Sequence, residues 1–299
     1  MFTIMLDVGG TEIKAGIADE TGELVGEIKH YPARSDKTQK EIFDNLSKII
    51  KERMLSVWGN KIGAISMAFP GPFDYEKGIS YMQNLGKYES IYGVSIPDEL
   101  QKRIPEMENV KICFAHDVEA FAVGAYHNGK TGGRGKAIFV CIGTGAGSAF
   151  VENGKVLKEP QSGVPENGWI YNTPFRDTVI DDYLSVRGLD AICQRIMEKS
   201  LSGLELYQLC MSGNKNALAV YKEFGEILAD CLVDFLDKYV PDTLVFGGQI
   251  SKSFLFFGDR VTKLCREKNI KILMEPDTSY RTMQGLYMIA QRRKTDGIS

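Results

Sequence analysis

Two short glycine-rich segments carry the residue types that bind phosphate groups. Residues 7–11 read Asp-Val-Gly-Gly-Thr and are followed by Lys14, and residues 143–147 read Gly-Thr-Gly-Ala-Gly. Glycines allow a tight turn and a close approach of the backbone to a ligand, and successive backbone N–H groups can then point at phosphate oxygens. Each segment follows an apolar run that is typical of a strand. The two together favour a nucleotide held from two sides, although a glycine pair can also serve only a hairpin turn.

A third glycine pair, at residues 247–248, ends another apolar run and could lie against an adenine ring. A strand and not a helix is expected after residue 147, which argues against a dinucleotide-binding fingerprint, and the ending typical of a P-loop is absent. Asp7 could hold a hydrated Mg²⁺, because this ion prefers one or two carboxylates together with water and substrate phosphates. The candidate nucleotide-binding residues are Asp7, Gly9, Gly10, Thr11, Lys14, Gly143, Thr144, Gly145, Gly147, Gly247 and Gly248.

Asp117 follows a short apolar strand and precedes an expected helix over about residues 118–126. An aspartate at this position can be a helix N-cap. It can also be a general base that takes the proton of a substrate hydroxyl while a phosphoryl group is transferred. The residues alone leave both interpretations open.

The elements that must position these residues form an α/β pattern that occurs twice. In the first half we expect strands at residues 2–6, 13–18, 23–31 and 62–68 and a helix at 38–57. The pattern restarts with strands at residues 137–142 and 148–151 and a hairpin turn at 152–155. Helices are expected at residues 179–199, 216–239 and 280–292, and a further strand at 243–246.

Composition narrows the class of protein. A chain of 299 residues favours two domains, and 43% hydrophobic and 25% charged residues are typical of a soluble globular protein. A net charge of −3 argues against nucleic-acid and anionic-membrane partners. There is no signal-peptide pattern and no apolar run of about 18 to 20 residues that could span a membrane. The six cysteines are scattered without a CxxC pair, which indicates reduced thiols and predicts a cytoplasmic protein.

Taken in this order, the motifs resemble those of the ROK family of sugar kinases and repressors, within the actin-like ATPase superfamily. The resemblance covers essentially the whole chain: the two phosphate motifs and the adenosine motif are matched as above, residues 68–72 match the sugar-domain loop, and Asp117 falls at the catalytic base. It implies an α/β fold with two actin-like (ribonuclease H-like) domains around a central cleft. The domains would be residues 1–115, completed by a C-terminal helix at 284–299, and residues 116–283.

The resemblance further implies glucokinase-like, ATP- and Mg²⁺-dependent phosphorylation of a hexose or hexose derivative at its 6-hydroxyl, by a homodimer. The residues that would contact the sugar are Gly71, Asn84, His116, Asp117, Glu166, Trp169 and Asp181. Two other functions have to be weighed. A repressor would need a helix-turn-helix domain ahead of residue 7, where no room for one is expected. A degenerate sugar or nucleotide sensor would not need a base such as Asp117.

The chain departs from the family pattern at several sugar-facing positions. Trp169 stands where the family often has a histidine that can bind zinc, and the cysteine cluster that usually follows is missing, so we expect no zinc site. His116 replaces an asparagine, and Asp181 replaces a longer glutamate. These changes alter the size of the pocket and its hydrogen-bond donors. They predict that plain glucose is a mediocre substrate and that a differently substituted hexose is preferred.

Overall fold

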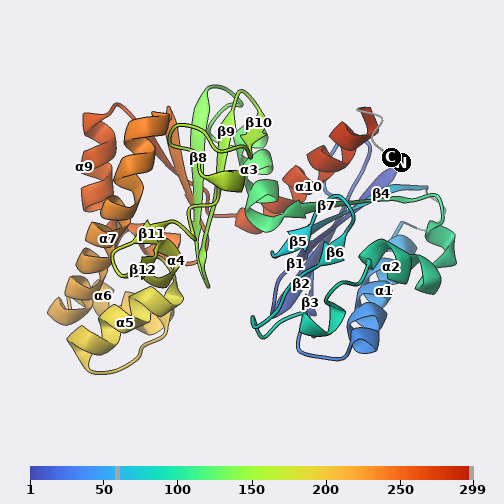
Figure 1. Ribbon diagram of the computed structural model, residues 1–299, viewed down its shortest axis with the longest axis horizontal. Coiled ribbons are helices and arrows are strands. Elements are labelled where there is room, and N and C mark those ends of the chain that lie inside the picture. The colour runs from blue at the N-terminus through green and yellow to red at the C-terminus, as the bar shows by residue number, and fades with distance from the viewer. Residues whose placement is uncertain (58–60, 296–299) are drawn as a thin grey trace. The chain divides into compact units, whose positions relative to one another are not determined.

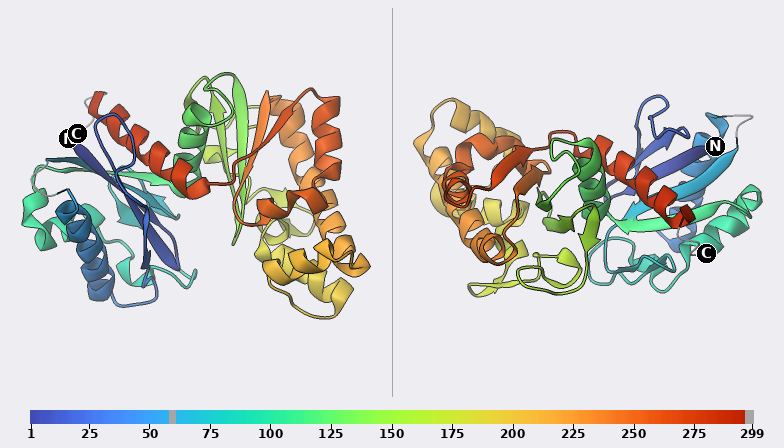
Figure 2. Two further views of the ribbon diagram at one scale, coloured as in Figure 1. Left: turned by 180° about the vertical axis from the view of Figure 1, so that it is seen from behind. Right: turned by 90° about the horizontal axis from the view of Figure 1, so that it is seen from above.

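The computed structural model describes residues 1–57 and 61–295 and divides into two compact units (Figures 1 and 2). Unit 1 comprises Met1–Ala125 together with the chain from Ser279 onward, and unit 2 comprises Tyr126–Thr278. This boundary lies inside helix α3 (Asp117–Asn128), whereas we expected it just before that helix. The reason is that the first part of α3 packs against the C-terminal helix of unit 1, as described below.

Unit 1 is built on a five-stranded sheet in the order β3-β2-β1-β4-β7. The strands are β1 (Phe2–Val8), β2 (Glu12–Ala18), β3 (Lys29–Pro32), β4 (Ile62–Phe69) and β7 (Lys111–His116). Strand β2 is antiparallel to both β1 and β3, and β1, β4 and β7 run parallel. The helices are α1 (Gln39–Leu55), α2 (Ile96–Arg103), the start of α3, and α10 (Thr278–Thr295), and a small hairpin joins β5 (Phe73–Asp74) to β6 (Ile79–Ser80).

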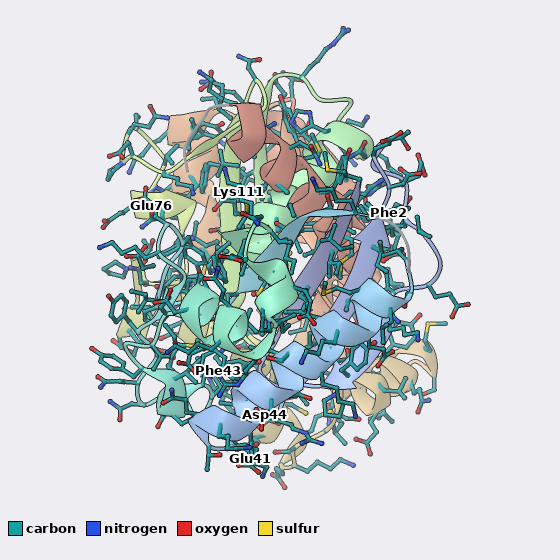
Figure 3. All side chains as sticks on the ribbon, turned by 90° about the vertical axis from the view of Figure 1, so that its right-hand side faces the viewer. Phe2, Glu41, Phe43, Asp44, Glu76 and Lys111 are labelled. Atoms are coloured by element: carbon teal, nitrogen blue, oxygen red, sulfur yellow. The ribbon has the colours of Figure 1, made fainter. Side chains whose placement is uncertain are left out.

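Side chains of β1 alternate between the two faces of this sheet, as the pleat requires. Ile4, Leu6 and Val8 join one hydrophobic core with Phe43 of α1, the helix labelled at Glu41, Phe43 and Asp44 in Figure 3. This helix begins at the Thr38 N-cap with a capping box to Glu41. On the other face α10 covers the sheet, where a Cβ on Gly16 of β2 would lie 3.3 Å from Met283 Sδ.

Two glycines allow α3 and α10 to cross in contact. A Cβ on Gly285 of α10 would lie 1.8 Å from the carbonyl oxygen of Ala120, and a Cβ on Gly124 of α3 would lie 1.9 Å from that of Arg281. No side chain fits into such gaps, so both positions require glycine. Because α3 begins at Asp117, this crossing fixes the helix that carries the candidate base.

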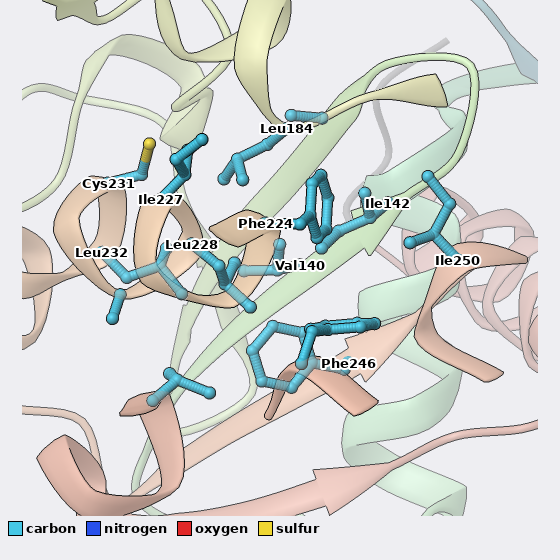
Figure 4. Close-up of a cluster of buried hydrophobic side chains, with 14 of the residues drawn as sticks. Val140, Ile142, Leu184, Phe224, Ile227, Leu228, Cys231, Leu232, Phe246 and Ile250 are labelled. Atoms are coloured by element: carbon cyan, nitrogen blue, oxygen red, sulfur yellow. The ribbon is translucent and has the colours of Figure 1, made fainter. Parts of the chain in front are cut away.

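Unit 2 repeats the same sheet with the order β10-β9-β8-β13-β14. Its strands are β8 (Lys136–Ile142), β9 (Ala146–Glu152), β10 (Lys155–Leu157), β13 (Thr243–Gly247) and β14 (Lys271–Met274). Again the first three are antiparallel and the others run parallel to the first. In Figure 4 Val140 and Phe246 of the sheet pack against Phe224 and Leu228 of α7. The expected duplication of one α/β unit is therefore confirmed.

The remaining elements of unit 2 form most of its helical layer and a second small hairpin. They are β11 (Pro174–Phe175), β12 (Thr178–Val179), α4 (Ile180–Tyr183), α5 (Val186–Met197), α6 (Gly203–Met211), α7 (Lys215–Tyr239), α8 (Phe254–Phe257) and α9 (Asp259–Glu267). Within the described residues, no helix has the length and apolar character needed to cross a membrane.

Two expected elements were wrong in extent. The strand expected at residues 23–31 is reduced to β3, because the preceding stretch is largely exposed and contains Gly26 at φ 73°. The helix expected at residues 179–199 is broken after Tyr183, because Ser185 adopts an extended conformation and caps the start of α5 through the N–H of Gly188. The pattern also missed α2, α6, α9 and β14.

Candidate active site

The first glycine turn joins β1 to β2 in unit 1. Asp7 and Lys14 face each other across this hairpin, with Lys14 Nζ 3.8 Å from Asp7 Oδ2, and the Gly9 N–H donates to the carbonyl of Glu12 at 2.9 Å. Lys14 also donates to Ser279 Oγ of α10 at 2.8 Å. The turn therefore presents a carboxylate and a lysine beside backbone that can approach a ligand closely.

The environment of Asp7 disfavours the ionised form of its carboxyl group. Burial raises its pKa from the ordinary 3.8 to about 6, although the charge of Lys14 opposes the shift and the negative charge of Asp117 adds to it. The charge of Asp117 thus acts on Asp7 within unit 1. A cation beside Asp7 would favour its ionised form.

Two side chains that sequence analysis missed hold the backbone of this turn. Tyr88 donates from its hydroxyl to the carbonyl of Gly9 at 2.8 Å, and the Ser35 hydroxyl donates to the carbonyl of Gly10. The N–H of Tyr88 in turn donates to the carbonyl of Ser35 at 2.7 Å. Tyr88 is completely buried, and no local sequence pattern links it to a turn that is far away in the chain.

Asp117 lies at the junction of β7 and α3, as expected. Its side chain is 48% exposed, and its Oδ1 accepts the N–H of Val118 at 2.7 Å and lies 3.0 Å from Nδ1 of the adjacent His116. Burial opposes ionisation, but His116, the Val118 N–H and the charge of Lys87 together hold the pKa of Asp117 below its ordinary value. The carboxylate is therefore ionised and accessible, as a general base must be.

Two of the other predicted sugar-facing residues of unit 1, Gly71 and His116, lie beside Tyr75. Gly71 lies beside Tyr75, whose hydroxyl would be 3.5 Å from a Cβ at Gly71 and donates to the carbonyl of Phe69 at 3.0 Å. The Tyr75 ring lies edge-on to the imidazole of His116, with centroids 6.1 Å apart. Asn84 is exposed and adopts a left-handed conformation at φ 56°. Tyr75 thus joins Gly71 and His116 although sequence analysis did not select it.

The second glycine turn joins β8 to β9 in unit 2, at the same place in its sheet as the first turn in unit 1. The Gly143 N–H donates to the carbonyl of Gly145 at 3.0 Å, and the N–H of Val186 donates to the carbonyl of Gly143 at 2.9 Å. Thr144 at the tip is exposed. A Cβ on Gly143 would meet nothing within 4 Å, so this turn leaves open space where a ligand could approach.

Asp181 is bound to this second turn. Its Oδ1 accepts the N–H of Ala146 at 2.7 Å and would lie 2.7 Å from a Cβ on Gly145, while its Oδ2 lies 2.7 Å from Arg187. Arg187 also lies 3.6 Å from Asp182. Both carboxylate oxygens of Asp181 are thereby engaged within unit 2, next to the candidate phosphate-binding residues.

Glu166 begins a short turn of 3-10 helix in unit 2 (Glu166–Gly168), and Trp169 follows it. Ser148 anchors this segment by donating to the carbonyl of Gly168 at 2.6 Å and accepting the N–H of Ile170 at 2.9 Å. The rings of Trp169 and Tyr171 lie 5.9 Å apart, centroid to centroid. Trp169 and Tyr171 therefore form an aromatic pair beside this turn.

The third glycine pair has a structural role that is independent of any ligand. Gly248 has φ 88°, and a Cβ there would lie 2.5 Å from the carbonyl oxygen of Ile142. The Ser251 hydroxyl donates to the carbonyl of Gly247. The close approach of this turn to the end of β8 requires glycine at residue 248.

Comparison with known proteins agrees with this geometry. Residues 3–284 match the model of the ROK family. An N-acetyl-D-glucosamine kinase of Salmonella typhimurium is 26% identical over 262 residues, which cover 82% of this chain and 83% of that protein. The crystal structure of a ROK hexokinase from Thermus thermophilus has a TM-score of 0.80 at 17% identity and covers 99% of this chain and all of the other. A ROK family glucokinase from Streptomyces griseus, solved with glucose and AMPPNP, has a TM-score of 0.75 at 17% identity and covers 98% and 100%.

The fold class expected from the sequence, with two actin-like α/β units, is confirmed by these structural neighbours. The family model spans nearly the whole chain, including the first and second glycine turns, Asp117 and the third glycine pair. This chain belongs to the ROK family.

Proposed function

We propose that this protein is an ATP-dependent kinase that phosphorylates a hydroxyl group of a sugar, with Asp117 as its general base. The position of Asp117 in unit 1 carries the proposal. Its exposed carboxylate is ionised at neutral pH and is near enough to the first glycine turn for its charge to raise the pKa of Asp7. Transfer of a phosphoryl group to an alcohol requires such a base beside a phosphate-binding turn.

In the proposed reaction, Asp117 takes the proton of the sugar hydroxyl, and each glycine turn can bind phosphate through its backbone N–H groups. The open space beside Gly143 and the single carboxylate of Asp7 fit a magnesium nucleotide. Asp7 would hold Mg²⁺ through water, and the bound ion would neutralise charge on the phosphates. Lys14 steadies Asp7, Thr11 and Thr144 add hydroxyl donors, and residues 247–248 would lie against the adenine.

For the substrate we propose a hexosamine such as N-acetyl-D-glucosamine, with the 6-hydroxyl as acceptor. The similarity to an N-acetyl-D-glucosamine kinase supports this class. The aromatic pair at Trp169 and Tyr171 offers an apolar face for an acetamido methyl group. Gly71, Asn84, His116 and Glu166 would contact sugar hydroxyls. Asp181, which we expected among these residues, we assign to the second glycine turn because both its oxygens are engaged there.

The test is a coupled ADP-release assay with Mg·ATP and a panel of glucose, mannose, N-acetyl-D-glucosamine and N-acetyl-D-mannosamine. We expect turnover with at least one N-acetylhexosamine that exceeds turnover with glucose. Asp117→Asn should lower kcat at least about 10²-fold. It should leave the thermal midpoint and ATP affinity unchanged, because asparagine can still accept the N–H of Val118.

Three outcomes would speak against parts of the proposal. ATP binding without turnover on any sugar would favour a sensor. Glucose as the best substrate would remove the hexosamine assignment alone. Near wild-type turnover by Asp117→Asn would remove the base. The homodimer and the cytoplasmic location remain part of the proposal, and sedimentation analysis and cell fractionation would test them.

A further inference from the structure

The loop at residues 84–89 is built around the first glycine turn. Asn84, Gly86 and Tyr88 all adopt left-handed backbone conformations, with φ of 56°, 66° and 56°. The Glu89 carboxylate accepts the N–H groups of Leu85 and Gly86 at 2.8 and 2.9 Å. With Tyr88 bonded to Gly9 and Ser35, both ends of this loop are fixed. The residue between Gly86 and Tyr88 is therefore held at one place.

That residue is Lys87, and its side chain lies over the turn. A Cβ on Gly10 would lie 3.1 Å from Lys87 Cδ and 3.9 Å from Lys87 Cβ, so the aliphatic stem passes directly across Gly10. Lys87 is half-buried. No hydrogen bond or ion pair joins its ammonium group to another residue in the described part of the chain. Lys14, in contrast, is already engaged by Asp7 and Ser279.

Lys87 is half-buried, makes no hydrogen bond or ion pair within the described residues, and lies next to backbone suited to phosphate, so it is placed to receive an anion. The charge of Lys87 also reaches Asp117, because Lys87 is among the groups that lower the pKa of that carboxyl. The turn at Gly10 and the base at Asp117 bracket the place where a phosphoryl group must pass from nucleotide to hydroxyl. Lys87 belongs to the same unit as both.

We propose that Lys87 binds the phosphoryl group in transit, as a cation that the two glycine motifs do not include. This inference rests on the proposed kinase function. In the step it serves, the sugar oxygen forms a bond to the terminal phosphorus of ATP and the bond from that phosphorus to the bridging oxygen breaks. The hydroxyl proton passes to Asp117, and ADP leaves with the bridging oxygen and its electron pair. Lys87 keeps its proton and neutralises charge on the oxygens of the moving group.

The experiment compares nucleotides that differ only in the terminal phosphate. Calorimetric titrations with Mg·AMPPNP and Mg·ADP are run on the full-length wild-type protein and on the K87M, K87R and K77M variants. Lys77 is an exposed lysine of the same unit in the turn between β5 and β6, so K77M is the matched control. Should K87M fail to fold, as judged by its thermal unfolding, K87Q gives a second neutral replacement.

We expect K87M to weaken Mg·AMPPNP binding about 10- to 100-fold, the effect of losing a hydrogen bond to a charged group. Binding of Mg·ADP should change less than about threefold. K87R should restore most of the difference, and K77M should leave both affinities unchanged. Equal weakening of both nucleotides, or no change in either, would overturn the assignment. A wild-type protein that binds nucleotide but phosphorylates no sugar would instead overturn the proposed function, and this inference with it.

Discussion

The carboxylate of Asp181 accepts a hydrogen bond of 2.7 Å from the backbone N–H of Ala146, in the second glycine turn. The N–H groups of such a turn are the donors expected to bind phosphate. The hydrogen bond from Ala146 to Asp181 fixes the backbone of this turn from within unit 2. The other carboxylate oxygen of Asp181 is paired with Arg187 at 2.7 Å. Asp181 therefore links the glycine turn to the first turn of α5, and we infer that it positions the backbone for nucleotide.

Removal of this carboxylate should weaken the binding of the nucleotide and leave the binding of the sugar unchanged. Asp181→Ala loses both contacts, and we expect the KM for ATP to rise about tenfold, the cost of one hydrogen bond to a charged group. The KM for the sugar should change little. Asp181→Asn keeps an acceptor for the N–H of Ala146, so its KM for ATP should lie between those of the wild type and of Asp181→Ala. Asp182→Asn is the control, because Asp182 also neighbours Arg187 but has no contact with the turn. A rise confined to the KM of the sugar would restore the role expected from the sequence.

Gly143 offers a test that separates a ligand-binding glycine from a merely structural one. A Cβ there meets nothing within 4 Å and Gly143 does not have a positive φ, so Gly143→Ala should change the free energy of unfolding by less than about 0.5 kcal/mol. The added methyl group projects into the space proposed for phosphate, and ATP affinity should fall at least about tenfold. Gly203→Ala, in similarly open space at the start of α6, should alter neither quantity. Unchanged ATP affinity in Gly143→Ala would mean that this glycine serves only the hairpin.

The local sequence pattern predicted the strands and helices that carry the candidate site better than it predicted the side-chain contacts within the site. The strands before and after both glycine turns, and helix α1 with its cap at Thr38, follow from apolar period and capping residues. Tyr88 and Tyr75 escaped notice because their roles depend on tertiary contacts. The bond from Tyr88 to Gly9 joins residues 79 positions apart, and no periodicity encodes such a pair.

The contacts of Asp181 likewise could not be read from local pattern. The family resemblance aligned it with a sugar-contacting glutamate, and that role stays a prediction. In the structure its carboxylate reaches Ala146 and Arg187. The break at Ser185, which fixes where α5 starts, depends on a cap within an otherwise helical pattern. Motif alignment thus selected candidate residues, whereas the contacts that these residues make within each unit had to come from the structure.

The raised pKa of Asp7 predicts that this residue costs stability in the metal-free protein. Its pKa is about 6 in the folded state against 3.8 ordinarily, which corresponds to about 3 kcal/mol at pH values above both. The folded state holds the proton more tightly, so this penalty is absent below pH 3.8, grows as the pH rises and is complete above about pH 6. Asp7→Asn should therefore stabilise the protein by up to about 3 kcal/mol at pH 8 and by nothing below pH 3.8, in urea unfolding with EDTA and without nucleotide.

Asp19→Asn should act in the opposite direction at pH 8, because hydrogen bonds from Thr21 lower the pKa of Asp19. Equal stability of wild type and Asp7→Asn at pH 8 would show that Asp7 is not held in an unfavourable environment before metal and nucleotide bind.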